Sequence, residues 1–270
     1  MKSINNFIRR VIFKIIFKNI YIYKFGILAA RYTNFLLPHE EDMHGLTHLK
    51  LDKSKIVVDV GASDGLYYKS IRHLGIKNKL YAFEPLKENI RYLKKISRKD
   101  KKFKYARLAL GNRSSNLSIY TPHYEGKYIN NFSSFSKNEC KKNFKINNFN
   151  INLKNLKFKK SSIKQKTLDS YKFKTALIKI DVEGYEKNVL LGAMNTIKRF
   201  KPIIYVENNK GKSDTINFFK KKLTRLKYKP YLFNCDNKSF VKYSKKEAGK
   251  KSFSYNVYFM VGIKINYRKK

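Results

Sequence analysis

The sequence contains few cysteine residues and no long uncharged apolar segment. Its two cysteines, Cys140 and Cys235, lie far apart and show no spacing typical of metal ligands. This arrangement predicts neither a zinc site nor a disulfide framework, so we expect a reduced protein in the cytoplasm. No run reaches the roughly 18 uncharged apolar residues that a membrane-spanning helix needs. Any membrane contact is therefore expected to be peripheral, at the inner membrane surface.

Acidic residues are scarce, and the charge balance is strongly basic. The chain has 61 Lys and Arg residues against 19 Asp and Glu residues, which gives a formal net charge of +42. The positive electrostatic potential that results from this charge favours anionic partners such as nucleic acid, acidic glycan or anionic lipid. The excess is mostly lysine and accompanies many Asn, Ile, Phe and Tyr residues, whose codons are rich in A and T. A biased genome gives the same composition, so the charge permits an anionic partner without identifying one.

Residues 1–50 differ in pattern from the rest of the chain. Arg10, Lys14 and Lys18 recur every four residues and so share one face of a helix, whereas apolar side chains cover much of the remainder. This pattern predicts a basic amphipathic helical segment before a domain over residues 51–270. Two interpretations stay open. The helix lies on an anionic membrane surface, or it packs as a cap on the domain that follows.

Residues 56–65, I-V-V-D-V-G-A-S-D-G, are the stretch around which the chain is organised. A β-branched strand passes through Asp59 into a loop whose glycines let the backbone approach a ligand, as in nucleotide-like cofactor sites. The loop lacks the middle glycine of G-x-G-x-x-G, and its acids repel a pyrophosphate. S-adenosylmethionine fits better, because it has two positive centres and no phosphate. The loop residues that we assign to cofactor binding are Gly61, Ala62, Ser63 and Gly65.

A second strand, over residues 79–83, is followed by an acidic residue that fits the same cofactor. The run K-L-Y-A-F-E-P places Glu84 at the strand end. There a carboxylate can accept hydrogen bonds from both hydroxyls of an adenosine ribose. Together with Asp59 and the glycine loop, Glu84 therefore predicts a nucleoside-cofactor site.

Strand and helix patterns alternate from Ile56 onward, which predicts right-handed βαβ units around a parallel sheet. Strands are expected over residues 56–60, 79–83, 103–110, 175–182, 202–207, 231–233 and 256–263. Helices are expected over residues 65–74, 87–98, 185–199 and 213–226. The sequence thus predicts an α/β, Rossmann-like fold with a mostly parallel seven-stranded sheet and helices on both faces. The alternation of strands and helices is interrupted at residues 112–166. This insertion either forms the substrate-binding side of the domain or is a poorly ordered loop.

Four predicted strands end in an acid, namely Asp59, Glu84, Asp181 and Glu207. Ligands of open α/β sheets bind at the carboxyl ends of the strands, so these acids should converge on one cleft. Methyl transfer to a hydroxyl needs alignment and removal of one proton. Asp181 is the candidate general base, or it binds Mg²⁺ together with Glu207 and Asn208. The sequence leaves both roles open.

The run L-I-K-I-D-V-E-G-Y-E-K-N-V-L-L-G-A, residues 177–193, followed by K-P-I-I-Y-V-E, resembles the signature of the FkbM family of S-adenosylmethionine-dependent methyltransferases. The runs V-D-V-G-A-S-D-G, F-E-P, A-L-G at residues 109–111 and T-L-D at residues 167–169 are similar as well. The resemblance implies a class I methyltransferase that usually acts on oxygen. It places Lys179, Asp181, Glu183 and Glu186 in the signature, and our candidate catalytic residues are Asp181, Glu183 and Lys179.

The resulting hypothesis is O-methylation of a sugar, glycan or glycolipid precursor, in polysaccharide biosynthesis. Two alternatives come from the charge. One is a nucleic-acid methyltransferase acting on ribose, because the base-methylating motif is missing where residues 181–184 read D-V-E-G. The other is a basic binding module without catalysis, which would require a degraded cofactor site. The loop and Glu84 are intact in the sequence, which favours the enzyme.

Overall fold

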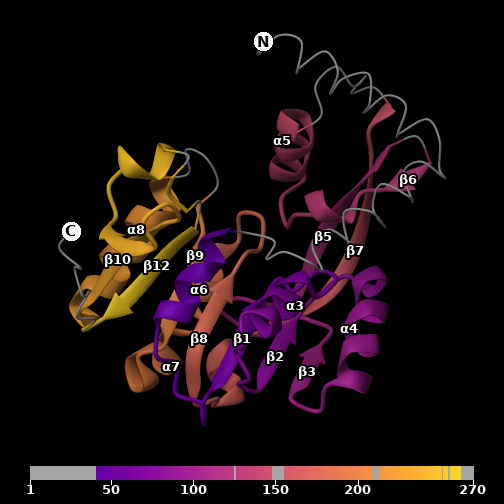
Figure 1. The fold of residues 1–270 in the computed structure, drawn as a ribbon. Coiled ribbons are helices and arrows are strands. Elements are labelled where there is room, and N and C mark those ends of the chain that lie inside the picture. The colour runs from indigo at the N-terminus through magenta and orange to yellow at the C-terminus, as the bar shows by residue number, and fades with distance from the viewer. Residues whose placement is uncertain are drawn as a thin grey trace. The chain divides into compact units, whose positions relative to one another are not determined.

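The computed structural model describes residues 41–124, 126–147, 155–208, 213–250, 252–254 and 256–262. The predicted N-terminal helix therefore lies outside the described residues. The chain divides into two compact units (Figure 1). The larger unit comprises residues 38–116 and 164–270, and the smaller one includes residues 117–163. In the part of the chain that is described, no helix combines the length and apolar character needed to cross a membrane.

An eight-stranded sheet forms the centre of the larger unit. Its strands, in their order across the sheet, are β11 (Ser239–Lys242), β10 (Tyr228–Asn234), β12 (Asn256–Val261), β9 (Ile203–Glu207), β8 (Thr175–Ile180), β1 (Ile56–Val60), β2 (Leu80–Phe83) and β3 (Phe103–Ala106). The five strands from β3 to β9 pair in parallel, whereas β12, β10 and β11 pair antiparallel. The predicted mostly parallel α/β sheet is thus confirmed.

The sheet has one strand more than the seven predicted. The additional strand is β11, which forms a hairpin with β10. The side-chain Oδ1 of Asn234 accepts hydrogen bonds from the backbone N–H groups of Asp236 and Asn237, and so closes the turn between the two strands. The prediction missed β11 because its four residues, S-F-V-K, lie at a sheet edge with only Phe240 buried.

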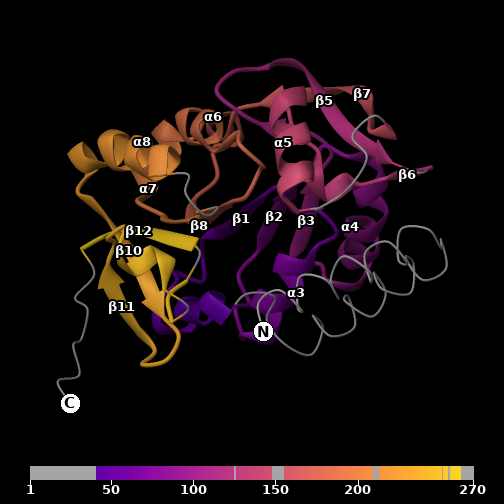
Figure 2. The same cartoon turned by 90° about the horizontal axis from the view of Figure 1, so that it is seen from above.

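Helices cover both faces of the large sheet, as predicted (Figure 2). One face packs against the 3₁₀ helix η1 (Glu41–His48), α3 (Leu66–His73) and α4 (Lys87–Lys99). The other face packs against α6 (Glu186–Leu191), α7 (Met194–Phe200) and α8 (Ser213–Leu223). Short 3₁₀ helices η4 (Leu168–Tyr171), η5 (Thr224–Leu226) and η6 (Glu247–Gly249) complete the unit. All six side chains of β8 are buried, as expected for a central parallel strand.

The single helix predicted over residues 185–199 is two helices, because the chain turns at Gly192. A side chain at Gly192 would collide with the carbonyl oxygen of Gly111, so only glycine allows this close backbone approach. The carboxylate of Asp169 then accepts hydrogen bonds from the N–H groups of Asn195 and Thr196 at the start of α7. The A-L-G and T-L-D runs therefore have a structural role in joining these segments.

The smaller unit contains regular structure inside the predicted insertion. Its elements are β6 (Lys127–Tyr128), η2 (Asn130–Phe132), α5 (Lys137–Asn147) and most of β5 (Ser115–Tyr124) and β7 (Lys157–Lys166). With β4 (Ala109–Leu110), these strands form a second sheet in the order β4-β7-β5-β6. The single strand predicted over residues 103–110 is thus two strands, β3 and β4, in different sheets. The hydroxyls of Thr121 and Ser133 are hydrogen-bonded at 2.9 Å in the interior.

Candidate active site

The glycine loop after β1 is shaped by its packing against neighbouring backbone and side chains. Gly61 has φ +80°, and a Cβ there would collide with the carbonyl oxygen of Asp181 at the end of β8. Gly65 has φ +85°, and a Cβ there would collide with Ile96 of α4. Both positions therefore require glycine before any ligand is considered. Gly61 permits the loop after β1 to approach the end of β8, and Gly65 permits it to pack against α4.

Hydrogen bonds to the end of β2 hold the loop in place. The N–H groups of Gly61 and Ala62 both donate to the carbonyl oxygen of Phe83, at 3.0 and 3.1 Å. The N–H of Ser63 donates to Oε2 of Glu84 at 2.8 Å. The sequence suggested that glycine-loop backbone groups would face the cofactor, yet these three N–H groups are used within the protein. The loop is thus preorganised, and Glu84 is one of its supports.

Glu84 is a buried carboxylate, and its burial disfavours the charged form. It is 4% exposed, and its Oε1 accepts a hydrogen bond from the N–H of Leu86 at 2.8 Å. Burial raises the pKa of Glu84 to about 7, although the N–H groups of Leu86 and Ser63 favour the charged form. A ligand that donates hydrogen bonds to this carboxylate would stabilise its charged form. The predicted contact with the ribose hydroxyls remains a prediction.

Lys179 connects the two acids on either side of it. In the parallel register Asp59 of β1 lies opposite Lys179 of β8, and both side chains are on the face covered by α3. Because side chains alternate, Asp181 follows Lys179 on the same side of the chain. The Lys179 ammonium lies 3.3 Å from Oδ1 of Asp59, 3.2 Å from Oδ2 of Asp181 and 3.1 Å from the carbonyl oxygen of Gly61. The ammonium of Lys179 therefore contacts both Asp59 and Asp181, two of the predicted site residues.

Asp59 has no exposed surface, and burial raises its pKa, an effect opposed by the positive charge of Lys179. Asp181 is much more accessible, with 35% of its side chain exposed against 10% for Lys179. In space, the cluster thus runs from the buried acid Asp59 through the buried cation Lys179 to the accessible acid Asp181. Only the last of these three can readily reach a bound molecule.

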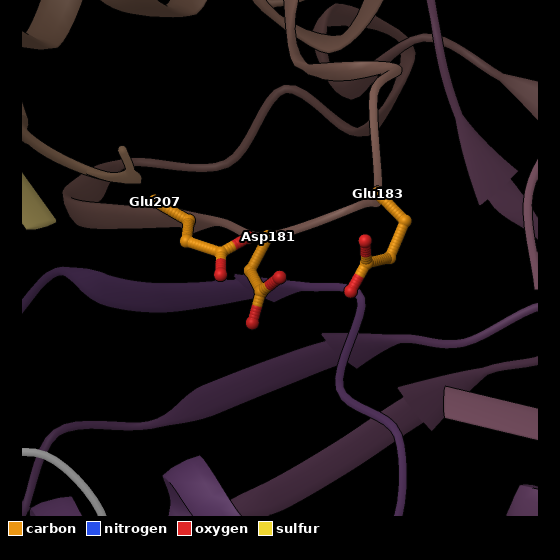
Figure 3. Close-up of side chains that lie close together, drawn as sticks. All are labelled: Asp181, Glu183 and Glu207. Atoms are coloured by element: carbon orange, nitrogen blue, oxygen red, sulfur yellow. The ribbon is translucent and has the colours of Figure 1, made fainter. Parts of the chain in front are cut away.

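Three acids gather at the carboxyl ends of β8 and β9. Carboxylate oxygens of Asp181, Glu183 and Glu207 lie within 4.8 Å of one another, and Figure 3 shows Asp181 between the other two. Burial, together with the negative charges of Asp181 and Glu183, raises the pKa of Glu207 to about 9. The raised pKa favours the protonated form of Glu207 at neutral pH, and a side-chain hydrogen bond joins Glu207 to Asp181. Glu183 has φ +51°, a strained conformation for a side chain other than glycine.

The predicted magnesium set is only partly reproduced by this cluster. Asp181 and Glu207 belong to it, and Glu183 is the third acid. Asn208, the third predicted ligand, is buried and follows Glu207 directly. Glu186, a member of the signature, is 4% exposed, and its Oε1 accepts a hydrogen bond from the N–H of Gly184. Glu186 thus shapes the turn that carries Glu183.

Sequence reasoning missed two tyrosines beneath the site. The Lys179 ammonium lies 5.6 Å from the ring centre of Tyr67, which stacks on Tyr205 at 6.4 Å. The Tyr205 hydroxyl accepts a hydrogen bond from the side-chain N–H of Asn256. Tyr205 lies opposite Lys179 in the parallel register of β8 and β9. Its place could have been inferred from alternation on β9, since it stands two residues before Glu207.

The protonated state of Glu207 gives a prediction about stability. An acid whose pKa rises from 4.5 to about 9 on folding destabilises the folded state progressively between those two pH values. Below pH 4.5 this cost is absent, because both states are protonated. Glu207→Gln mimics the protonated form, so we expect the free energy of unfolding to rise by about 1–3 kcal/mol at pH 8.

Urea denaturation of the wild type and Glu207→Gln at pH 8 and pH 4 checks this expectation, and at pH 4 the two should have similar stability. Glu247→Gln, at a surface ion pair with Lys250, is the matched control and should change stability little at either pH. A less stable Glu207→Gln at pH 8 would contradict the protonated state.

The sheet order and the site together define the class of protein. Parallel strands β3-β2-β1-β8-β9 are followed by β12, which runs antiparallel to β9, and then by β10, which runs antiparallel to β12. The glycine loop follows β1, and Glu84 follows β2. This is the arrangement of a class I methyltransferase. The sequence matches the Methyltransferase FkbM domain over residues 59–233. The chain therefore belongs to the FkbM family of S-adenosylmethionine-dependent methyltransferases.

Solved structures resemble the protein at low sequence identity. Methyltransferase FkbM from Methylobacillus flagellatus KT is 17% identical with a TM-score of 0.49; the match covers 78% of this chain and 44% of that one. This chain thus spans less than half of that protein. Precorrin-6y C5,15-methyltransferase from Geobacter metallireducens GS-15 is 10% identical, with a TM-score of 0.40 and coverage of 82% and 87%.

The plantazolicin methyltransferase BpumL, in complex with SAH, is also 10% identical, with a TM-score of 0.36 and coverage of 97% and 98%. Among curated proteins no significant match was found.

Proposed function

We propose that the protein transfers the methyl group of S-adenosylmethionine to a hydroxyl oxygen of a sugar, glycan or glycolipid precursor. The observation that carries this proposal is the accessible carboxylate of Asp181, which lies beside the cofactor loop through its shared contact with Lys179 and Gly61. Methyl transfer needs an acceptor oxygen in line with the methyl group and sulfur. A carboxylate at this position supplies the one further requirement of a hydroxyl acceptor, a group that takes its proton.

In the proposed step, a lone pair of the acceptor oxygen forms a bond to the methyl carbon while the carbon–sulfur bond breaks. The hydroxyl proton passes to Asp181, and the products are a methyl ether and S-adenosylhomocysteine. Glu207 supports this role of Asp181, because its hydrogen bond to Asp181 holds that carboxylate in place beside the loop. A carboxylate oxygen of Glu183 lies within 4.8 Å of one of Asp181, so Glu183 would contact the acceptor.

The alternative role of Asp181, as a ligand of Mg²⁺, is less well supported. One oxygen of Asp181 already lies 3.2 Å from an ammonium group, and a divalent cation there would meet a second positive charge. Methyl transfer is therefore expected to proceed unchanged in the presence of EDTA. Loss of transfer on chelation, with recovery on adding Mg²⁺, would assign the carboxylates of Asp181 and Glu207 to the metal instead.

A second candidate acceptor is RNA, which the net charge of +42 favours. The test uses labelled S-adenosylmethionine with purified protein and three acceptor pools: nucleotide sugars and polysaccharide, lipid-linked sugars, and RNA. We expect methyl groups to enter a carbohydrate pool as ethers. Labelling of RNA alone would replace the proposal with ribose methylation. Cofactor binding without labelling of any pool would contradict the carbohydrate acceptor, and absence of cofactor binding would favour a basic binding module.

A further inference from the structure

Lys179 occupies a position that the reaction itself does not explain. Its ammonium is nearly buried, since only 10% of the side chain is exposed, so it has little surface to offer an acceptor. Three oxygens surround it: Oδ1 of Asp59, Oδ2 of Asp181 and the carbonyl oxygen of Gly61. The ring of Tyr67, in the first turn of α3, lies on another side at 5.6 Å. A charged group held by this many partners has a fixed position.

The three oxygens belong to different parts of the site. Asp59 is the acid at the end of β1, Gly61 begins the cofactor loop, and Asp181 follows β8 as the accessible acid. A single ammonium group therefore joins the cofactor side of the site to the side where we place the chemistry. The hydrogen bond to Gly61 also fixes the orientation of the peptide at which the loop turns away from β1.

The charge of Lys179 is needed by Asp59 in particular. Asp59 has no solvent exposure, and among the described residues the Lys179 ammonium is what compensates its charge. A carboxylate left buried without a partner is strongly destabilised, and it takes up a proton instead. Removal of the ammonium would therefore change both the charge of Asp59 and the position of the loop that starts two residues later.

We propose that Lys179 is a positioning residue, whose ammonium favours the charged form of Asp59 and holds the Gly61 loop in its binding conformation, so that it acts on cofactor binding through Asp59. This inference rests on the proposed function, because it assumes that the loop binds S-adenosylmethionine or its product. It assigns Lys179 a role different from that of Asp181, although the two are neighbours in the same signature.

The test is calorimetric titration of the full chain with S-adenosylhomocysteine. We expect Lys179→Met to bind at least tenfold more weakly than the wild type, and Lys179→Arg, which restores the positive charge, to recover part of the loss. Lys174→Met is the matched control, because Lys174 is exposed and stands just before the same strand. The control should bind as the wild type does. Thermal melting followed by circular dichroism verifies that each variant is folded.

A double-variant cycle shows whether Lys179 acts through Asp59. In the Asp59→Asn background there is no buried charge to compensate, so Lys179→Met should cost at most threefold in affinity. This comparison also covers the case in which Lys179→Met alone fails to fold, since the double variant contains neither buried charge. An equal loss in both backgrounds would overturn the proposal, as would unchanged affinity of Lys179→Met. Absence of binding by the wild type would instead overturn the proposed function.

Discussion

Replacing Glu84 with alanine is expected to weaken binding of S-adenosylhomocysteine at least a hundredfold. Hydrogen bonds to a charged group contribute about 1.5–3 kcal/mol each, and two ribose hydroxyls are available to this carboxylate. The variant also loses the bond from the Ser63 N–H, so the glycine loop loses one of its supports. Calorimetric titration measures the loss, with Glu247→Gln as a control at an exposed ion pair. An affinity within threefold of the wild type would show that Glu84 is not at the cofactor site.

The same carboxylate should make cofactor binding depend on pH. Because the pKa of Glu84 is about 7 in the free protein, it is mostly charged at pH 8 and mostly protonated at pH 6. Binding that requires the charged form should therefore weaken about tenfold as the pH falls from 8 to 6. Glu84→Gln cannot titrate, so its weaker affinity should stay constant over this range. A wild-type affinity that rises toward pH 6 would have the wrong sign for this role.

Replacing Asp181 with asparagine should abolish most of the turnover while leaving cofactor binding nearly intact. An amide of the same shape cannot take the acceptor proton, and general-base catalysis contributes about 10²–10⁴-fold to rate. We expect a loss of that size in methyl transfer, together with an affinity for S-adenosylhomocysteine within threefold of the wild type. Asp236→Asn, in the turn between β10 and β11, is the control and should retain full activity.

The two measurements on Asp181→Asn separate its role from that of its neighbours. Near-normal turnover would exclude Asp181 as the base. Loss of cofactor binding together with turnover would assign Asp181 to the cofactor site, beside Asp59 and Lys179. Retained binding with lost turnover distinguishes the accessible acid Asp181 from the buried pair of Asp59 and Lys179, which we propose acts on cofactor binding.

Sequence reasoning succeeded where the position of a side chain follows from strand periodicity. The four acids lie within one residue of the carboxyl ends of their strands, and parallel strands bring these ends to one edge: Asp59, Glu84, Asp181 and Glu207. The prediction that the four acids mark one region therefore needed only the order of elements. It did not need the register between strands.

The contacts that define the site were harder to predict because they depend on register and on backbone packing. Lys179 is opposite Asp59 only in the observed pairing of β1 with β8, which leaves the ammonium between two acids. The turn at Gly192 likewise depends on its approach to Gly111, a residue far away in the sequence. Gly192, a residue that disfavours helix interiors, was the local sign of this interruption within the helix predicted over residues 185–199.

The most direct test of the account is whether the purified wild-type protein binds S-adenosylhomocysteine at the site formed by the glycine loop and Glu84. Calorimetric titration at pH 8 should give one molecule bound per chain with a dissociation constant in the micromolar range, and Glu84→Ala should remove the signal. Absence of binding by a folded wild-type protein would contradict the cofactor site. So would binding that Glu84→Ala leaves unchanged.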